Sequence, residues 1–193
     1  MHKPVYLGPL SPEYALLGLL AQRPAHGYEL HQRLVTELGQ IWHTSQSQTY
    51  NILNRLEAQG YIAGETVEQE KLPARKRFIL TQLGHERFLD WLRSPGGCSA
   101  RSIRVEFLTR LHFARSTSPE LMQELFKGQY REVRSGLRRL NQMLAAIPTE
   151  QVINRLGLDL RIRQLESILK WLTEARSLIE ASEDMKKRET QHS

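Results

Sequence analysis

Residues 45–62 read SQSQTYNILNRLEAQGYI, and this stretch decides the fold of the first half of the chain. Ser45 and Gln48 have the spacing of a capping box, in which each side chain bonds the backbone N–H of the other residue at a helix start. The residues that follow form one apolar stripe at helical spacing, namely Thr49, Ile52, Leu53 and Leu56. Gly60 is a residue type that commonly ends helices in the left-handed conformation. We therefore predict an amphipathic helix that starts at Ser45 and ends near Gly60.

Elements on both sides of this helix complete a recognisable order. Two further helices are predicted before it, over 11–22 and 28–38, because proline and glycine separate two segments with helical spacing. After it the spacing changes to two short β-like runs, 62–67 and 75–80, which predict a hairpin. A fourth helix is expected over 81–91. Three short helices followed by a hairpin form a winged helix-turn-helix, whose third helix enters the DNA major groove.

The exposed face of the third predicted helix is polar and uncharged. Turning 100° per residue from the apolar stripe places Ser47, Tyr50, Asn51, Asn54 and Ala58 outward, with Gln46 and Gln48 flanking them. Amide side chains can pair with adenine, and hydroxyl groups commonly reach phosphate oxygens. The simpler alternative is that Tyr50 and Asn54 are ordinary surface residues of a core helix.

The predicted hairpin carries the densest basic cluster of the first half of the chain, Arg75-Lys76-Arg77. Such a wing would contact the DNA backbone or the minor groove. The alternative is that the basic triplet is only a solvated strand end. The expected DNA-binding residues are Gln46, Ser47, Gln48, Tyr50, Asn51, Asn54, Arg75, Lys76 and Arg77.

A run of small and helix-breaking residues, 94–100, separates two patterned regions. It predicts a DNA-binding domain over 1–95, an all-helical dimerisation domain over 101–185 and a frayed tail over 186–193. The long helices of the second region have narrow apolar seams that are hard to bury in a monomer, so we expect a second copy to cover them. The residues expected at this interface are Leu137, Leu140, Leu144, Leu165, Leu169 and Leu172. The fold class expected is mainly α, with a two-stranded β wing.

Composition limits the classes of function. The net charge of +6 favours a polyanionic partner, although the excess lies mostly in the second half of the chain and does not locate a DNA site. The single cysteine, Cys98, cannot form an intrachain disulfide and fits a reducing compartment. We find neither a signal peptide nor a membrane-spanning segment, and expect a cytoplasmic protein without a membrane partner.

The sequence shows no arrangement typical of an enzyme. The seven histidines include no HxxxH or HxxH pair, so no metal site is expected, and no cofactor motif is found. Ser45 and Ser47 lack the surroundings of a nucleophile, and we expect no catalytic residue.

Three motifs together resemble the PadR family of winged-helix regulators: HGYEL (26–30), SQSQTYNILNRLEAQGYI (45–62) and LPARKRFILTQLG (72–84). The second region, with Trp171-Leu172-Glu174-Ala175, resembles the dimerisation domain of longer PadR members and of related virulence-gene activators. The resemblance implies that Tyr50 meets the DNA backbone and that Arg75 and Lys76 are the basic wing pair. Family members usually carry proline where Asn51 stands and often where Gln46 stands, so the operator can differ.

The resemblance also raises the question of an effector, because some family members are thought to stack flat aromatic compounds at the dimer interface. Trp42, Trp91 and Trp171 are the candidates for a small aromatic effector, against the commoner role of tryptophan in packing.

The function expected is that of a sequence-specific transcriptional regulator, binding a pseudo-palindromic double-stranded operator as a homodimer. It represses if the operator overlaps a promoter. The alternative is a protein-interaction adaptor, in which the helical region recruits a partner and the winged helix has lost DNA binding.

Overall fold

The structure is a computed structural model that describes residues 11–69, 72–94 and 96–191. For 66–69, 72–75 and 183–191 it describes the backbone only. The chain forms two compact units, Met1–Ser94 with Arg104–Ser118, and Pro95–Ile103 with Pro119–Ser193. We describe each unit separately.

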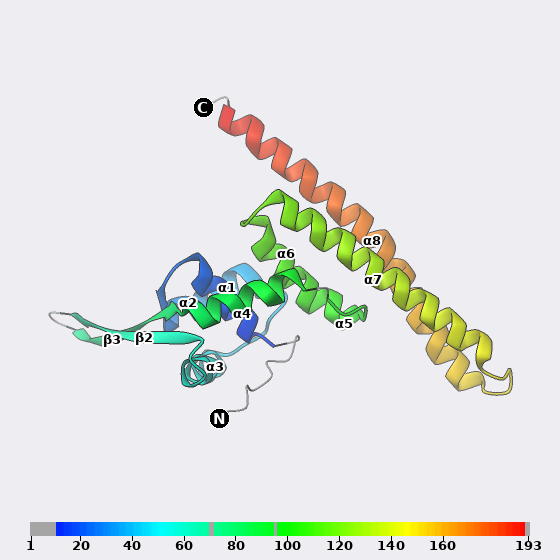
Figure 1. Cartoon of the computed structure of the whole chain (residues 1–193), viewed down its shortest axis with the longest axis horizontal. Helices are drawn as coiled ribbons and strands as arrows, with labels where there is room; N and C mark the ends of the chain where they lie inside the picture. Colours follow the sequence, from blue (N-terminus) through cyan, green and yellow to red (C-terminus); the bar gives the residue numbers. More distant parts are fainter. Residues whose placement is uncertain (1–10, 70–71, 95, 192–193) are drawn as a thin grey trace. The chain divides into compact units, whose positions relative to one another are not determined.

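The first unit is a winged helix-turn-helix, which confirms the predicted fold class (Figure 1). Short helices precede the β-hairpin, and a further helix follows it. The bounds are α1 Glu13–Gln22, β1 Ala25–His26, α2 Gly27–Leu38, α3 Gln46–Ala58, β2 Ile62–Gln69, β3 Leu72–Leu80, α4 Gln82–Arg93 and α6 Leu108–Arg115.

The sheet has three antiparallel strands in the order β1-β3-β2. Strand β1 was not predicted, since two residues are too few to show the alternation of a strand. It places His26 opposite Arg77, and Arg77 in turn lies opposite Glu65 of β2. The wing is therefore tied at its base to the residue directly before α2.

Helix α1 forms the centre of the first unit. It is buried on all sides, and such a helix lies inside a core rather than on its surface. The leucines of the neighbouring helices pack with it, and those with no exposed area include Leu30, Leu34, Leu53, Leu56 and Leu92. At α3 the buried residues are Thr49, Ile52, Leu53 and Leu56, as predicted from the stripe.

The segment Arg104–Ser118 packs in the first unit, whereas the sequence analysis placed it in the second. Trp42 Nε1 donates a hydrogen bond to Thr109 Oγ1 at 2.9 Å, and the Phe113 ring meets the Phe88 ring edge-on at 5.4 Å. Gly18 of α1 faces the Phe113 ring, where any side chain would collide with it. These contacts explain the difference: the winged helix supplies the apolar surface that buries this segment.

The second unit is a helical hairpin of α7, Pro119–Ala146, and α8, Val152–Gln191, together with the short helix α5, Ala100–Ser102 (Figure 1). Arg155 closes the turn, because its Nη1 donates to the carbonyl oxygens of Leu144 at 3.2 Å and Ile147 at 2.8 Å. Helix α8 continues to Gln191, through most of the expected frayed tail. The sequence of 183–191 contains no glycine or proline and is rich in good helix formers, which accounts for the difference.

In the described ranges, no helix has both the length and the apolar character needed to cross a membrane.

Candidate nucleic-acid interface

The start of α3 is fixed by hydrogen bonds at its N-terminus. Ser45 Oγ accepts from the Gln48 N–H at 3.2 Å, and Gln48 Oε1 accepts from the Ser45 N–H at 2.9 Å, which is the predicted capping box. Thr49 Oγ1 donates to the Ser45 carbonyl at 3.1 Å. His31 Nδ1 lies 3.0 Å from the same hydroxyl and must be the donor there, since a hydroxyl has one proton. Helix α2 thereby holds the first turn of α3.

A second attachment holds the far end of α3. Arg55 donates from Nε to Glu13 Oε1 at 2.5 Å, and the Glu13 carboxylate is 3% exposed. A buried carboxylate is tolerated only when it is paired, so this bond strongly favours one orientation of α3 against α1.

The outward face of α3 carries the expected polar residues. Tyr50 is 37% exposed, and the other exposed residues on this face are Gln46, Ser47, Asn51 and Asn54. Gln48 is also exposed, but its amide oxygen is used by the capping box. The exposure of this face agrees with the helical periodicity, whereas its DNA-binding role stays a prediction.

A cavity of about 730 Å³ lies between the start of α2, the face of α3 and strand β3. We call it the α2–α3 groove. The Tyr50 ring forms one wall and lies directly against Gly27, where a Cβ atom would be 2.6 Å from Tyr50 Cε1. The residues that line the groove are His26, Gly27, Tyr28, Glu29, Tyr50, Asn54, Lys76 and Phe78.

Sequence reasoning missed five of the eight residues that line this groove, and His26 and Tyr28 are among them. His26 Nδ1 lies 3.1 Å from the Lys76 carbonyl, which can only accept, so Nδ1 is the donor. Tyr28 is 57% exposed. The HGY motif contained the signal, because Gly27 permits the close approach of Tyr50 between these two polar side chains.

The basic cluster of the wing is divided between the two faces of the hairpin. Successive side chains of a strand point to opposite faces, so Lys76 and Arg77 diverge. Lys76 Nζ donates to Glu57 Oε2 of α3 at 2.6 Å, while Arg77 is exposed opposite Glu65. The Arg75 side chain lies outside the described residues. Only Lys76 is shown beside the face of α3.

The three tryptophans do not form one pocket within either unit. Trp42 is hydrogen-bonded to Thr109, and Trp91 stacks on Tyr14 with ring centroids 4.6 Å apart. The Arg110 guanidinium lies 4.9 Å from the Trp91 ring, and its pKa is lowered by burial, an effect that the Glu106 carboxylate opposes. Trp171, in the second unit, is 37% exposed on α8. An effector at these residues stays a prediction.

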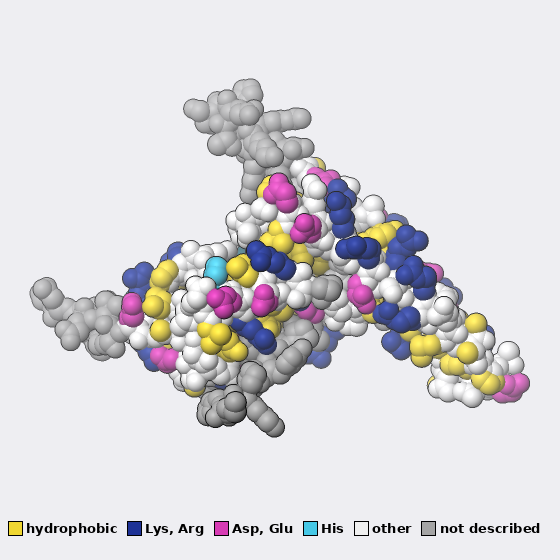
Figure 2. Space-filling model, in the orientation of Figure 1, with side chains coloured by type: hydrophobic (Ala, Val, Ile, Leu, Met, Phe, Trp, Pro, Cys, Tyr) yellow, Lys and Arg dark blue, Asp and Glu magenta, His cyan; other side chains and the backbone are white. Residues whose placement is uncertain are grey.

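The residues expected at the dimer interface differ in their exposure. Leu140, Leu165 and Leu172 are buried within one chain between α7 and α8, because the two helices cover each other's seams. Leu137, Leu144 and Leu169 are half-buried. The exposed apolar side chains lie elsewhere on the hairpin, and many gather near its turn (Figure 2): Tyr130, Met143, Val152, Ile153, Leu156, Leu160, Trp171 and Leu178.

Two family matches cover most of the chain. Residues 16–90 match the transcriptional regulator PadR-like family, and residues 103–180 match the virulence activator alpha C-terminal family. The first match covers most of the winged helix, which is therefore similar to the PadR-like family, and the second covers most of the C-terminal helices. The small-residue segment at 94–100 lies in the gap between the two matches.

The similar proteins include regulators of two bacteria. The chain is 32% identical over 119 residues to the negative transcriptional regulator PadR of Bacillus subtilis, covering 61% of this chain and 64% of that protein. It is 27% identical over 82 residues to a protein of Mycobacterium tuberculosis named as a probable transcriptional regulator, covering 42% of this chain and 43% of that protein. The chain therefore spans less than two thirds of the length of these relatives.

Solved structures of PadR-like proteins are also similar. Bacillus subtilis PadR in complex with operator DNA is 26% identical and has a TM-score of 0.44, with 86% of this chain and 96% of that chain covered.

Proposed function

We propose that this PadR-like protein is a sequence-specific DNA-binding regulator of transcription rather than an enzyme. The observation that carries the proposal is the exposed, uncharged polar face of α3, which is held rigidly beside Lys76 of the wing. Such a helix can enter the major groove and read base edges, while a cation beside it contacts the backbone.

The groove residues divide into two roles in this proposal. Asn51 and Asn54 lie on the face of α3 that would meet base edges, where an amide pairs with adenine. Tyr50, with His26 and Tyr28 across the groove, would contact phosphate oxygens, which fix the register of a protein on DNA without reading sequence. Lys76, Arg77 and Arg75 would contact the backbone from the wing. Gln46, Ser47 and Gln48 complete the contact surface at the start of α3.

A homodimer fits the exposed apolar residues of the second unit. A second copy would present the same α3 at a second major-groove face, about one helical turn away, which matches a pseudo-palindromic operator. Repression follows if that operator overlaps a promoter, in keeping with the name of the Bacillus subtilis relative. A cytoplasmic location follows from such a role, and a small aromatic effector would act on this dimer.

The test is a mobility-shift series on DNA upstream of the gene that encodes the chain, from low to high salt. We expect a specific shift that weakens steeply as salt rises, because each phosphate contact releases counterions. A variant with Lys76→Ala and Arg77→Ala should lose the shift. Its control removes the same charge from α8, with Arg163→Ala and Lys170→Ala, and should keep it.

The adaptor alternative makes the opposite prediction. If the helical region acts by recruiting a partner, the Lys76→Ala, Arg77→Ala variant keeps its function, and the unmodified chain gives no salt-dependent shift on its upstream DNA or on genomic fragments. That result would contradict the proposed DNA-binding function.

A further inference from the structure

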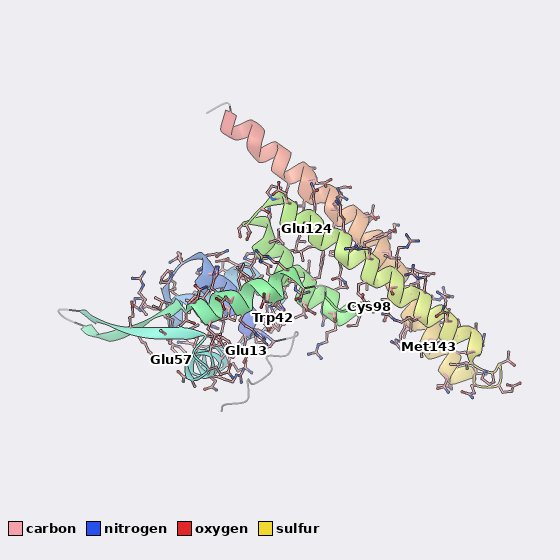
Figure 3. The ribbon with its side chains drawn as sticks, viewed as in Figure 1. Glu13, Trp42, Glu57, Cys98, Glu124 and Met143 are labelled. Atoms are coloured by element: carbon pink, nitrogen blue, oxygen red, sulfur yellow. The ribbon has the colours of Figure 1, made fainter. Side chains whose placement is uncertain are left out.

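Glu57 places a negative charge inside the basic side of the candidate interface. Glu57 is labelled in Figure 3. Its Oε2 accepts from Lys76 Nζ at 2.6 Å, and its Oε1 accepts from the Gly64 N–H at 3.1 Å. The Glu57 side chain is 30% exposed and that of Lys76 is 47% exposed. The cation expected to meet DNA is therefore already paired, at the point where α3 approaches the hairpin.

Gly64 of β2 makes this pairing sterically feasible. A Cβ atom at this position would collide with Lys76 Cε and would lie 2.7 Å from Glu57 Oε1. Gly64 lies opposite Phe78 in the sheet, and among the described residues only Gly60 has a positive φ. Gly64 is thus needed for space rather than for an unusual backbone conformation. Its bare backbone lets the Lys76 side chain cross the strand to reach Glu57.

We propose that Glu57 limits the affinity of the protein for DNA, because it restrains the binding of DNA phosphate by Lys76. This inference rests on the proposed DNA-binding function. A phosphate must compete with the Glu57 carboxylate for the Lys76 ammonium. The restraint acts equally on every sequence. It lowers the affinity for operator and arbitrary DNA by the same factor, so the ratio between the two affinities still depends on the neutral contacts of α3.

The substitution Glu57→Gln removes the charge and keeps the shape of the side chain. Its amide oxygen can still accept from the Gly64 N–H, so the tie between α3 and β2 is retained. The probe is a fluorescently labelled 24-base-pair duplex of arbitrary sequence, and the readout is anisotropy across a salt series. The control is Glu65→Gln, which makes the same change of charge on the other face of the hairpin, opposite Arg77.

We expect Glu57→Gln to bind this duplex about two- to fivefold more tightly than the unmodified chain, the ratio that corresponds to losing one partly exposed ion pair. The salt dependence should steepen by up to about one released counterion, because Lys76 no longer divides its charge between Glu57 and phosphate. Glu65→Gln should change the affinity less. In a chain that also carries Lys76→Gln, the gain from Glu57→Gln should disappear.

A second variant breaks the pair without changing any charge. Gly64→Ala displaces the flexible end of the Lys76 side chain from Glu57 and should also tighten binding to the arbitrary duplex. Its control is Gly128→Ala on α7, where a Cβ atom meets nothing within 4 Å. Thermal unfolding of each variant reports whether the winged helix is intact.

Three results would overturn the inference: equal affinities for Glu57→Gln and Glu65→Gln, a gain that persists without Lys76, or weaker binding by folded Glu57→Gln. The last would mean that the carboxylate positions Lys76 for DNA instead of restraining it. A failure of the proposed function is distinguishable, because the unmodified chain would then bind neither this duplex nor its upstream DNA.

Discussion

Tyr50 owes its position at the interface to the absence of a side chain at Gly27. The ring lies where a Cβ atom of residue 27 would be, 2.6 Å from Cε1 and 3.0 Å from Cζ. Gly27 is also the first residue of α2, a place where alanine is a better helix former than glycine. The same substitution therefore acts in opposite directions on the helix and on the interface.

We predict that Gly27→Ala displaces the Tyr50 ring and weakens operator binding about as much as Tyr50→Ala does, on the order of tenfold for one lost contact of about 1.4 kcal/mol. The stability of the fold should change by less than about 1 kcal/mol. Operator affinity by anisotropy and urea denaturation on the same preparation test this. Unchanged affinity in the folded variant would show that the ring has no part in binding.

His112 of α6 links stability to pH. Burial lowers its pKa below the ordinary 6.5, an effect that Glu37, with Oε2 3.2 Å from His112 Nε2, opposes without reversing it. Above about pH 6.5 the ring is neutral in both the folded and the unfolded chain. As the pH falls, the unfolded chain takes up the proton first, so the free energy of unfolding decreases until the folded pKa is passed.

We predict that the unmodified chain loses more stability between pH 7.5 and pH 5.5 than His112→Gln does. Urea denaturation at the two pH values measures the difference, and the exposed His43→Gln is the matched control. A His112→Gln variant with the same pH dependence as the unmodified chain would contradict the assignment.

For single residues, the sequence predicted which side chains are exposed and polar more readily than it predicted which residues they contact. The outward positions of Tyr50 and Asn54 followed from the helical period of α3. The separation of Lys76 from Arg77 could also have been predicted, from the period of a strand. The Lys76–Glu57 pair could not, since it depends on how the hairpin lies against α3.

At the scale of the element, α3 depends on its first turn. Ser45 Oγ satisfies the Gln48 N–H, one of the donors that have no partner within the helix. We predict that Ser45→Ala lowers the free energy of unfolding by about 1 kcal/mol, the usual cost of losing such a cap. Ser47→Ala is the control, because Ser47 is exposed in the first turn of the same helix and does not cap it. Equal stability of the two variants in urea would mean that the cap contributes nothing.

The helices and strands were largely predictable from the sequence. The compact unit in which each of them packs was not. The helices and hairpin of the first unit follow from periodicity and from glycine, proline and capping residues. The segment Arg104–Ser118 has apolar residues that any neighbouring core could bury, and its pattern does not say which. Trp42 and Phe88, far away in sequence, decide it by contacting Thr109 and Phe113.

On the scale of the whole molecule, the second unit has more apolar seam than one chain can cover. Helix α8 buries Leu158, Ile162, Leu165 and Leu172 against α7. A second set lies at helical spacing on its exposed side, and it includes Ile153, Leu156 and Leu160, exposed by 79%, 59% and 58%. The sequence showed that apolar seams exist, but it could not assign them to one chain or to two, because both uses have the same period.

The exposed set gives the sharpest test of the proposed homodimer. We predict a single species of twice the 22.4 kDa chain mass by light scattering, and a shift toward the single-chain mass on Ile153→Glu with Leu160→Glu. The charged side chains would be desolvated at an apolar interface, which costs several kcal/mol per charge.

Asn154→Glu with Gln164→Glu adds the same charge at exposed polar positions of α8 and should leave the dimer intact. Leu165→Glu should instead lower the helical content, since Leu165 is buried within one chain. A monomeric unmodified chain would contradict the proposed homodimer. A dimer whose mass is unchanged by charge at Ile153 and Leu160 would show that its interface lies elsewhere than this side of α8.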